Sequence, residues 1–114
     1  MMLFKPEHVP LILSGRKTQT RRLGKKRWNV GAIHQCQTKM LRNDSVFAHV
    51  RILDVSRSDP IASLSDEDVY AEGYDEWRDF WSVWCAINGG GSSPSATPWV
   101  VEFELVTAPV RSGG

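Results

Sequence analysis

A polar segment near the amino terminus holds the side chains best suited to chemistry: Gly15-Arg16-Lys17-Thr18-Gln19-Thr20-Arg21-Arg22. A lysine or arginine here can hold an anion or polarise a carbonyl, and a hydroxyl beside a basic amine can act as a nucleophile. The first four residues resemble part of a phosphate-binding loop. A Walker A loop, however, needs a Gly-Lys pair with a further glycine five residues earlier, and both are missing. The segment therefore excludes a nucleoside triphosphatase of that class.

A second cluster follows shortly afterwards and combines cations with an indole: Lys25-Lys26-Arg27-Trp28. Such a cluster can bind phosphate groups through its cations and stack a base on its aromatic ring. A solvated surface loop has the same composition. The sequence leaves both interpretations open.

Metal binding and membrane insertion are not predicted. The three histidines, His8, His34 and His49, are scattered without ligand spacing, so we expect no metal and no other cofactor. The longest apolar run, residues 9–13, is far shorter than the roughly 18 residues of a membrane span. The first residues also lack the pattern of a secretory signal. We therefore expect a cytoplasmic protein whose two cysteines are free thiols.

The net charge of +1 hides a strong asymmetry along the chain. Residues 1–58 hold twelve Lys and Arg against three acidic residues, a net +9, and the remainder holds two against ten, a net −8. If folding separates these halves in space, one basic face results, and a basic face indicates an anionic partner. If the halves instead pair across the surface, no such face is formed. Composition alone does not choose between these outcomes.

Short strands spread along the chain, with helices between them, predict an α+β fold. The clearest strand has apolar residues at every second position from Val46 to Ile52. The aromatic spacing in residues 76–87 is typical of an amphipathic helix that packs on a core. The pattern predicts helices at 7–14, 65–72 and 76–87, and strands at 17–23, 32–39, 46–55 and 99–106.

Helix ends and domain limits follow from local signals. Ser65 is a predicted N-cap with Asp68 as its capping-box partner, Gly73 is the predicted stop, and Asp75 is the predicted cap of the next helix. A length of 114 residues allows a single domain. We assign that domain to residues 1–108 and a flexible tail to 109–114.

Several of these segments together resemble the ASCH domain family. Its signature is a helix ending in glycine, then Lys-Thr-x-Thr-x-Arg leading into a strand, and the sequence matches it at Gly15, Lys17, Thr18, Thr20 and Arg22. Further matches are a Val-Gly pair before the second strand, an acidic helix ending in Glu-Gly-aromatic, a helix rich in tryptophan and a terminal strand. The matching segments are residues 30–31, 64–74, 76–87 and 99–103.

The resemblance implies a small PUA-like β-barrel with two or three short helices and a cleft between barrel and helices. It places Lys17, Thr20, Arg22 and Glu72 in that cleft. One branch of the family hydrolyses N4-acetylcytidine, and there the residues matching Lys17, Thr20 and Glu72 are catalytic. This sequence has Gln19 and Arg21 around Thr20, where that branch has isoleucines, so it resembles the general family more closely.

Our preferred interpretation is therefore a protein that binds RNA or a modified nucleoside. We expect Arg16, Arg22, Lys25, Lys26, Arg27 and Trp28 to be the binding residues. The alternative is an amidohydrolase acting on N4-acetylcytidine through Lys17, Thr20 and Glu72, and a ribonuclease is a weaker third. Residues three apart in a regular strand face opposite sides. Lys17 and Thr20 can share a cleft only if Lys17 precedes the strand.

Overall fold

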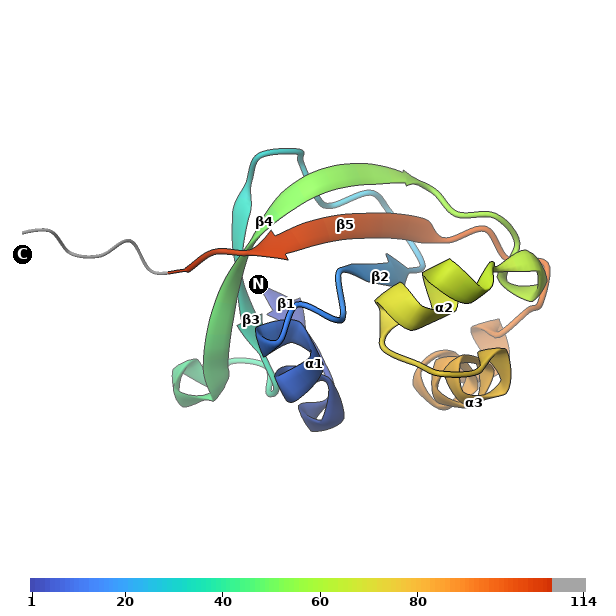
Figure 1. Ribbon diagram of the computed structural model, residues 1–114, viewed down its shortest axis with the longest axis horizontal. Coiled ribbons are helices and arrows are strands. Elements are labelled where there is room, and N and C mark those ends of the chain that lie inside the picture. The colour runs from blue at the N-terminus through green and yellow to red at the C-terminus, as the bar shows by residue number, and fades with distance from the viewer. Residues whose placement is uncertain (108–114) are drawn as a thin grey trace, which may run out of the picture.

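A computed structural model describes residues 1–107 as a five-stranded mixed sheet that curls over three α-helices (Figure 1). The predicted tail, 109–114, lies outside the described residues. The sheet order is β1-β3-β4-β5-β2, with β1 and β3 parallel and the other pairs antiparallel. The strands are β1 (Met2–Leu3), β2 (Gln19–Arg22), β3 (Ile33–Gln37), β4 (Val46–Arg57) and β5 (Trp99–Leu105).

The predicted α+β class is confirmed, and the sheet curls in the manner of a partial barrel. Strands β4 and β5 run antiparallel along most of their length, with a register shift between Ile52 and Asp54. In the strand order β1 and β2 occupy the two edges, and no backbone pairing joins them within residues 1–107. A side chain spans the gap instead, because Arg22 Nη2 donates to the Leu3 carbonyl oxygen at 2.7 Å.

The helices are α1 (Val9–Leu13), α2 (Asp66–Glu72) and α3 (Trp77–Asn88). A short 3₁₀ turn, η1 (Pro6–His8), leads into α1. Figure 1 shows α1 beneath one end of the sheet and α2 and α3 beneath the other. No helix among residues 1–107 is long and apolar enough to cross a membrane.

The predicted ends of α2 are confirmed. Ser65 Oγ accepts the Asp68 backbone N–H at 3.1 Å, and Gly73 ends the helix with φ 105°, a backbone conformation that favours glycine. The prediction for α3 was wrong by one residue, since Glu76 is its N-cap and makes no side-chain cap. Asp75 pairs with Arg16 instead, at 2.8 Å.

Two apolar clusters form the core. The larger fills the concave side of the sheet, and the smaller lies where α3 meets the segment before α2. Phe80 and Trp84 of the predicted helical stripe are buried, whereas Trp77 and Trp81 stack on each other half-buried. The two cysteines are free thiols, as predicted. Buried residues of the larger cluster are Met2, Phe4, Ile12, Trp28, Cys36, Val50, Ile52, Val101 and Phe103.

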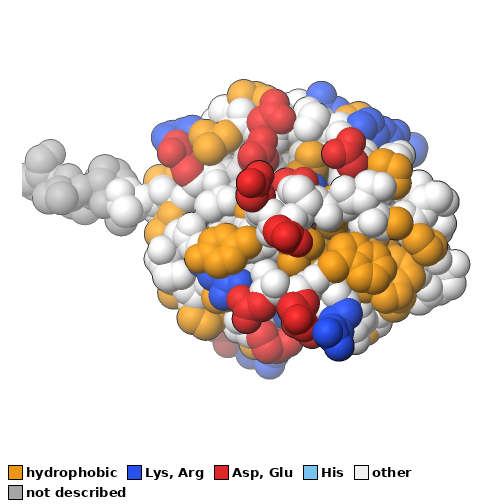
Figure 2. Space-filling view, turned by 45° about the vertical axis from the view of Figure 1, so that its right-hand side comes forward, with side chains coloured by type: hydrophobic (Ala, Val, Ile, Leu, Met, Phe, Trp, Pro, Cys, Tyr) orange, Lys and Arg blue, Asp and Glu red, His pale blue; other side chains and the backbone are white. Residues whose placement is uncertain are grey.

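The basic and acidic halves of the chain meet in ion pairs. Figure 2 shows acidic side chains along the middle of one face, with Lys and Arg mostly toward its margins. Five ion pairs among the described residues join a cation before residue 58 to an acid after it. Pairing between the halves therefore neutralises part of the positive charge of the first half. These pairs are Arg16–Asp75, Lys17–Glu72, Arg21–Asp68, Arg21–Glu72 and Arg51–Glu104.

Candidate functional site

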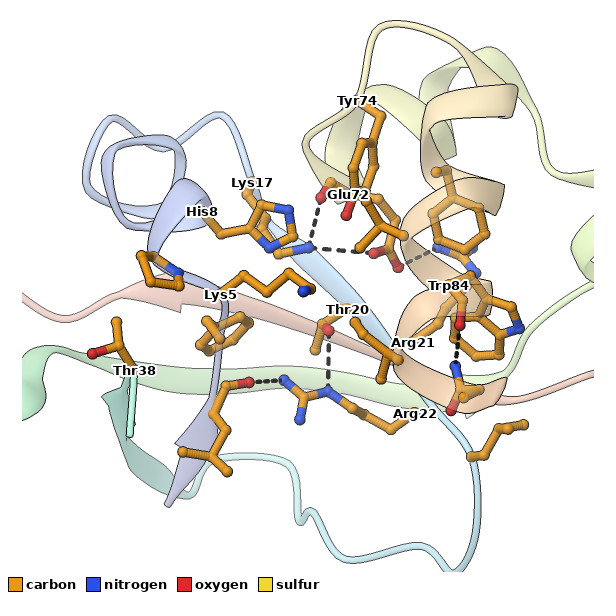
Figure 3. Close-up of a pocket in the computed structure, with 18 residues that line it drawn as sticks. Lys5, His8, Lys17, Thr20, Arg21, Arg22, Thr38, Glu72, Tyr74 and Trp84 are labelled. Carbon is orange, nitrogen blue, oxygen red and sulfur yellow. Dashed lines mark hydrogen bonds and ion pairs between the residues drawn. The ribbon is translucent and has the colours of Figure 1, made fainter. Parts of the chain in front are cut away.

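A cavity of about 550 Å³ opens between the amino-terminal segment, β2 and the inner face of α3 (Figure 3). All four residues singled out in the sequence, Lys17, Thr20, Arg22 and Glu72, line it. The strand β2 begins only at Gln19, so Lys17 precedes it. This is the position that Lys17 needs in order to share a cleft with Thr20. The polar segment 15–22 and the end of α2 thus meet at one place, although Lys17 and Glu72 are 55 positions apart in the sequence.

Lys17 is held rigidly at the back of the cavity. Its backbone N–H donates to the Leu11 carbonyl at 3.0 Å, which ties it to α1. Its side chain is 2% exposed, and Nζ donates to the backbone carbonyls of Glu72 at 2.6 Å and Gln19 at 3.1 Å and to Glu72 Oε1 at 3.3 Å. An ammonium group has three N–H donors, so all three are used. Burial lowers the pKa of Lys17, and the adjacent Glu72 carboxylate opposes that shift.

Glu72 joins two buried cations. Its Oε2 accepts from Arg21 Nη1 at 2.9 Å while its Oε1 faces Lys17. Arg21 also donates to Ser58 Oγ at 2.8 Å, and its Nη2 lies 3.6 Å from Asp68. The sequence analysis assigned Arg21 no role in the site. No signal in the sequence identifies Arg21, because its partners Glu72 and Asp68 are brought to it only by the fold.

Thr20 and Arg22 form the opposite side of the site. Alternation along β2 places these two on one face, and Gln19 and Arg21 on the other. Arg22 Nε donates to Thr20 Oγ1 at 3.2 Å, and Nη2 donates to the Leu3 carbonyl as described above. The guanidinium carbon lies 5.1 Å from the centre of the Phe4 ring, within range of a cation–π contact. Burial lowers the pKa of Arg22, but a guanidinium stays charged.

Aromatic and neutral polar groups complete the walls. Phe4, Tyr74, Phe80 and Trp84 line the cavity beside His8, whose ring meets that of Tyr74 edge-on at 5.4 Å. Burial, and then the positive charges of Lys17, Lys5 and Arg22, lower the pKa of His8 to about 4. His8 is therefore neutral at pH 7 and offers one donor and one acceptor. Burial also raises the pKa of the Tyr74 hydroxyl, which keeps it protonated.

The other predicted binding residues lie outside this cavity. Arg16 pairs with Asp75, and its guanidinium stacks over the Tyr70 ring at 4.3 Å. Lys25, Lys26 and Arg27 are exposed in the loop after β2.

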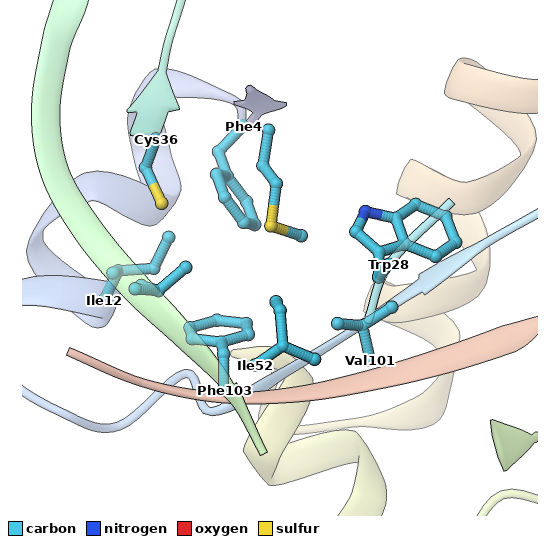
Figure 4. Packing of buried hydrophobic residues seen from close by; sticks show 9 residues of the cluster. Phe4, Ile12, Trp28, Cys36, Ile52, Val101 and Phe103 are labelled. Carbon is cyan, nitrogen blue, oxygen red and sulfur yellow. The ribbon is translucent and has the colours of Figure 1, made fainter. Parts of the chain in front are cut away.

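Trp28 requires a correction, because its indole cannot stack on a base from solvent. It is 8% exposed and belongs to the larger apolar cluster, where Figure 4 shows it among the buried side chains. Its indole is the most apolar group of the segment 25–28, and burying it removes more apolar area from water than an exposed position would. The cations of the loop thus lie at the surface without an aromatic platform at position 28.

Within the described part of the chain, the hydrogen bonds of the site do not join a base to Thr20, as activation of a hydroxyl nucleophile requires. Among residues 1–107 no hydrogen bond joins Lys17 to Thr20, and all three N–H groups of the Lys17 ammonium are used by Glu72 and Gln19. Thr20 Oγ1 is a hydrogen-bond acceptor for Arg22, which leaves its own hydrogen available to a ligand. No group of three or more His, Cys, Asp or Glu within residues 1–107 has the geometry of a metal site.

The curled mixed sheet and the three helices have the fold of solved ASCH-domain structures. An ASCH domain from Lactobacillus crispatus JV V101 superposes with a TM-score of 0.59 at 18% identity, covering 85% of this chain and 69% of its own.

Two further solved structures have the same fold. A protein of the family DUF984 from Enterococcus faecalis V583 superposes with a TM-score of 0.64 at 22% sequence identity, covering 88% of this chain and 70% of its own. The hypothetical protein PH0355 superposes with a TM-score of 0.68 at 16% sequence identity, covering 92% of this chain and 96% of its own. No family model and no curated protein matches the sequence. At these identities the likeness establishes the fold and agrees with the motifs in the sequence.

Proposed function

We propose that this chain is an ASCH-domain protein that binds RNA or a modified nucleoside in the cavity. Thr20, Arg22 and His8 are the polar groups that contact the ligand, and the aromatic walls hold its base. Lys17 and Glu72 act mainly by fixing the charge and shape of the site. The proposal is supported by a cavity volume in the range of small-ligand sites, about 300–1,000 Å³, with a few convergent polar groups between apolar walls.

The single observation that carries this proposal is the hydrogen bonding of Lys17. A catalytic lysine that activates a hydroxyl must lose its proton and lie within reach of that hydroxyl. Lys17 instead donates all three of its N–H groups to Glu72 and Gln19. Its charged form is therefore the one that the surroundings satisfy, which favours binding.

An amidohydrolase acting on N4-acetylcytidine is the second candidate function. It is favoured by one observation, the convergence of Lys17, Thr20 and Glu72 on the same cavity. In this case Lys17 would have to leave Glu72 when the substrate enters and accept the proton of Thr20.

One experiment separates the two. The protein is incubated with N4-acetylcytidine, cytidine release is followed by chromatography, and binding is followed by the intrinsic tryptophan fluorescence, to which Trp84 in the cavity wall contributes. We expect saturable binding without release, weakened about fivefold in Thr20→Val, because a hydrogen bond between neutral groups is worth about 1 kcal/mol and 1.4 kcal/mol is tenfold. Arg51→Gln, outside the cavity, is the matched control.

Turnover would reverse the assignment. If cytidine is released, and Lys17→Ala and Thr20→Ala abolish release while circular dichroism shows an intact fold, the protein is a hydrolase. If neither the nucleoside nor a short single-stranded RNA binds, the proposal fails. Cleavage of that RNA would identify a ribonuclease.

A further inference from the structure

The charges that line the cavity do not balance. Four cationic residues line it, Lys5, Lys17, Arg21 and Arg22, against one carboxylate, Glu72. The four side chains come from separate parts of the amino-terminal half, and Figure 3 shows Lys5 and Arg22 directed into the same space. A site with an excess of cations and partly apolar walls attracts a negatively charged group.

Two of the cations are already neutralised. Lys17 and Arg21 share the two oxygens of Glu72, and Arg21 has Asp68 as a second acid at 3.6 Å. Their charges are thus used in holding α2 against β2. Neither is available to a ligand without breaking a buried ion pair, which is costly.

Lys5 and Arg22 are in a different position. Within residues 1–107 neither lies within ion-pair distance of a carboxylate. Arg22 donates only to neutral oxygens, through Nε to Thr20 and through Nη2 to Leu3. Its Nη1 has no hydrogen-bond partner in the described part of the chain, and it is not sealed from solvent.

A half-buried guanidinium that has no acidic partner can bind an anionic ligand. Arginine presents paired N–H groups that match the oxygens of a phosphate or carboxylate, and such charge-assisted bonds are about twice as strong as neutral ones. The imidazole of His8 lies in the same cavity but is neutral, so it neither adds to nor offsets the positive charge of Arg22. Lys5, nearer the surface, adds a second cation to the site.

We propose that Arg22 and Lys5 form an anion subsite within the cavity, which holds a phosphate monoester of the bound nucleoside. The preferred ligand is accordingly a nucleoside monophosphate or a phosphorylated RNA end, with its base against the aromatic wall of Phe80 and Trp84. This inference rests on the proposed function, because the nucleoside part of the ligand comes from it.

The test is a calorimetric titration of the full chain at low salt with three kinds of probe: the nucleosides N4-acetylcytidine and cytidine, their 5′-monophosphates, and inorganic phosphate. We expect each monophosphate to bind at least about tenfold more tightly than its nucleoside, as expected for one charge-assisted contact. Arg22→Gln should remove about tenfold of that gain. Lys5→Gln should remove about threefold, because its partly exposed charge is better screened.

The outcomes are distinguishable. Equal binding of nucleoside and monophosphate, unaffected by Lys5→Gln, would overturn the anion subsite and leave the proposed function intact. Binding of inorganic phosphate as tight as that of the monophosphates would support the subsite and contradict a nucleoside ligand. No binding of any probe would overturn both. If Arg22→Gln fails to fold, Lys5→Gln still tests the anion subsite. Arg51→Gln, which removes a cation outside the cavity, is the control.

Discussion

At the scale of single residues, Glu72 determines whether the buried part of the site can exist. Its carboxylate is 5% exposed and contacts the ammonium of Lys17 on one oxygen and the guanidinium of Arg21 on the other. A carboxylate between two cations stabilises both of them in a region with little water. Removing it leaves two buried positive charges close together.

We therefore predict that Glu72→Gln lowers the free energy of unfolding by about 3–5 kcal/mol, the usual cost of leaving a buried charge without its partner. Glutamine keeps the shape of the side chain, so the decrease in the free energy of unfolding measures the effect of removing the negative charge. The control is Asp44→Asn, which breaks an exposed pair with Arg42 and should cost about 1 kcal/mol or less. Urea unfolding measures both. Equal losses for the two variants would contradict the prediction.

The sequence predicted the members of this site better than their contacts. Lys17, Thr20, Arg22 and Glu72 could be found because they match a spaced motif. Arg21 could not, because its role depends on which side of β2 the end of α2 covers, and that is a tertiary fact. The prediction for Trp28 was wrong for a related reason. An aromatic residue beside three cations has the same local sequence pattern whether its ring faces solvent or the core.

At the scale of elements, the turn after α2 positions the site. Gly73 has φ 105°, which ends the helix directly after Glu72, and the Glu72 carbonyl then accepts from Lys17. Serine before a run of acids and glycine after it are signals that sequence can supply, so both ends of α2 were predicted. The start of α3 was not, because the predicted cap, Asp75, has a competing partner in Arg16 that is distant in sequence.

We predict that Gly73→Ala destabilises the protein more than Gly15→Ala. Both glycines have positive φ, so alanine should cost each about 1–2 kcal/mol. Only at Gly73 would the new Cβ also lie close to a neighbour, 3.1 Å from Leu11 Cδ1, whereas nothing lies within 4 Å at Gly15. We expect an additional loss of about 1 kcal/mol at Gly73 from this crowding. Thermal and urea unfolding of the two variants would measure it. Equal losses would mean that Leu11 moves aside freely.

At the scale of the whole molecule, the charge asymmetry of the chain has two uses. Part of it is neutralised by ion pairs between the halves, such as Arg51–Glu104 on the sheet and the cluster around Glu72. Composition could not show this division, because the pairs depend on which residues the fold brings together. Another part is exposed in the loop after β2, at Lys25, Lys26 and Arg27. Sequence predicted that exposure but not its purpose.

The last prediction tests whether this loop contacts RNA. Neutralising phosphates releases counterions, so the logarithm of the binding constant falls linearly with the logarithm of salt concentration, by about 0.7 per phosphate contact on a single strand. Replacing Lys25, Lys26 and Arg27 together with alanine should therefore make the slope shallower by about 2, measured by fluorescence anisotropy of a labelled RNA between low and physiological salt. Arg78→Ala, an exposed arginine on α3 paired with Glu76, is the control and should leave the slope unchanged. If the triple variant has the slope of the unmodified protein, the loop is solvated, and the cavity alone holds the RNA.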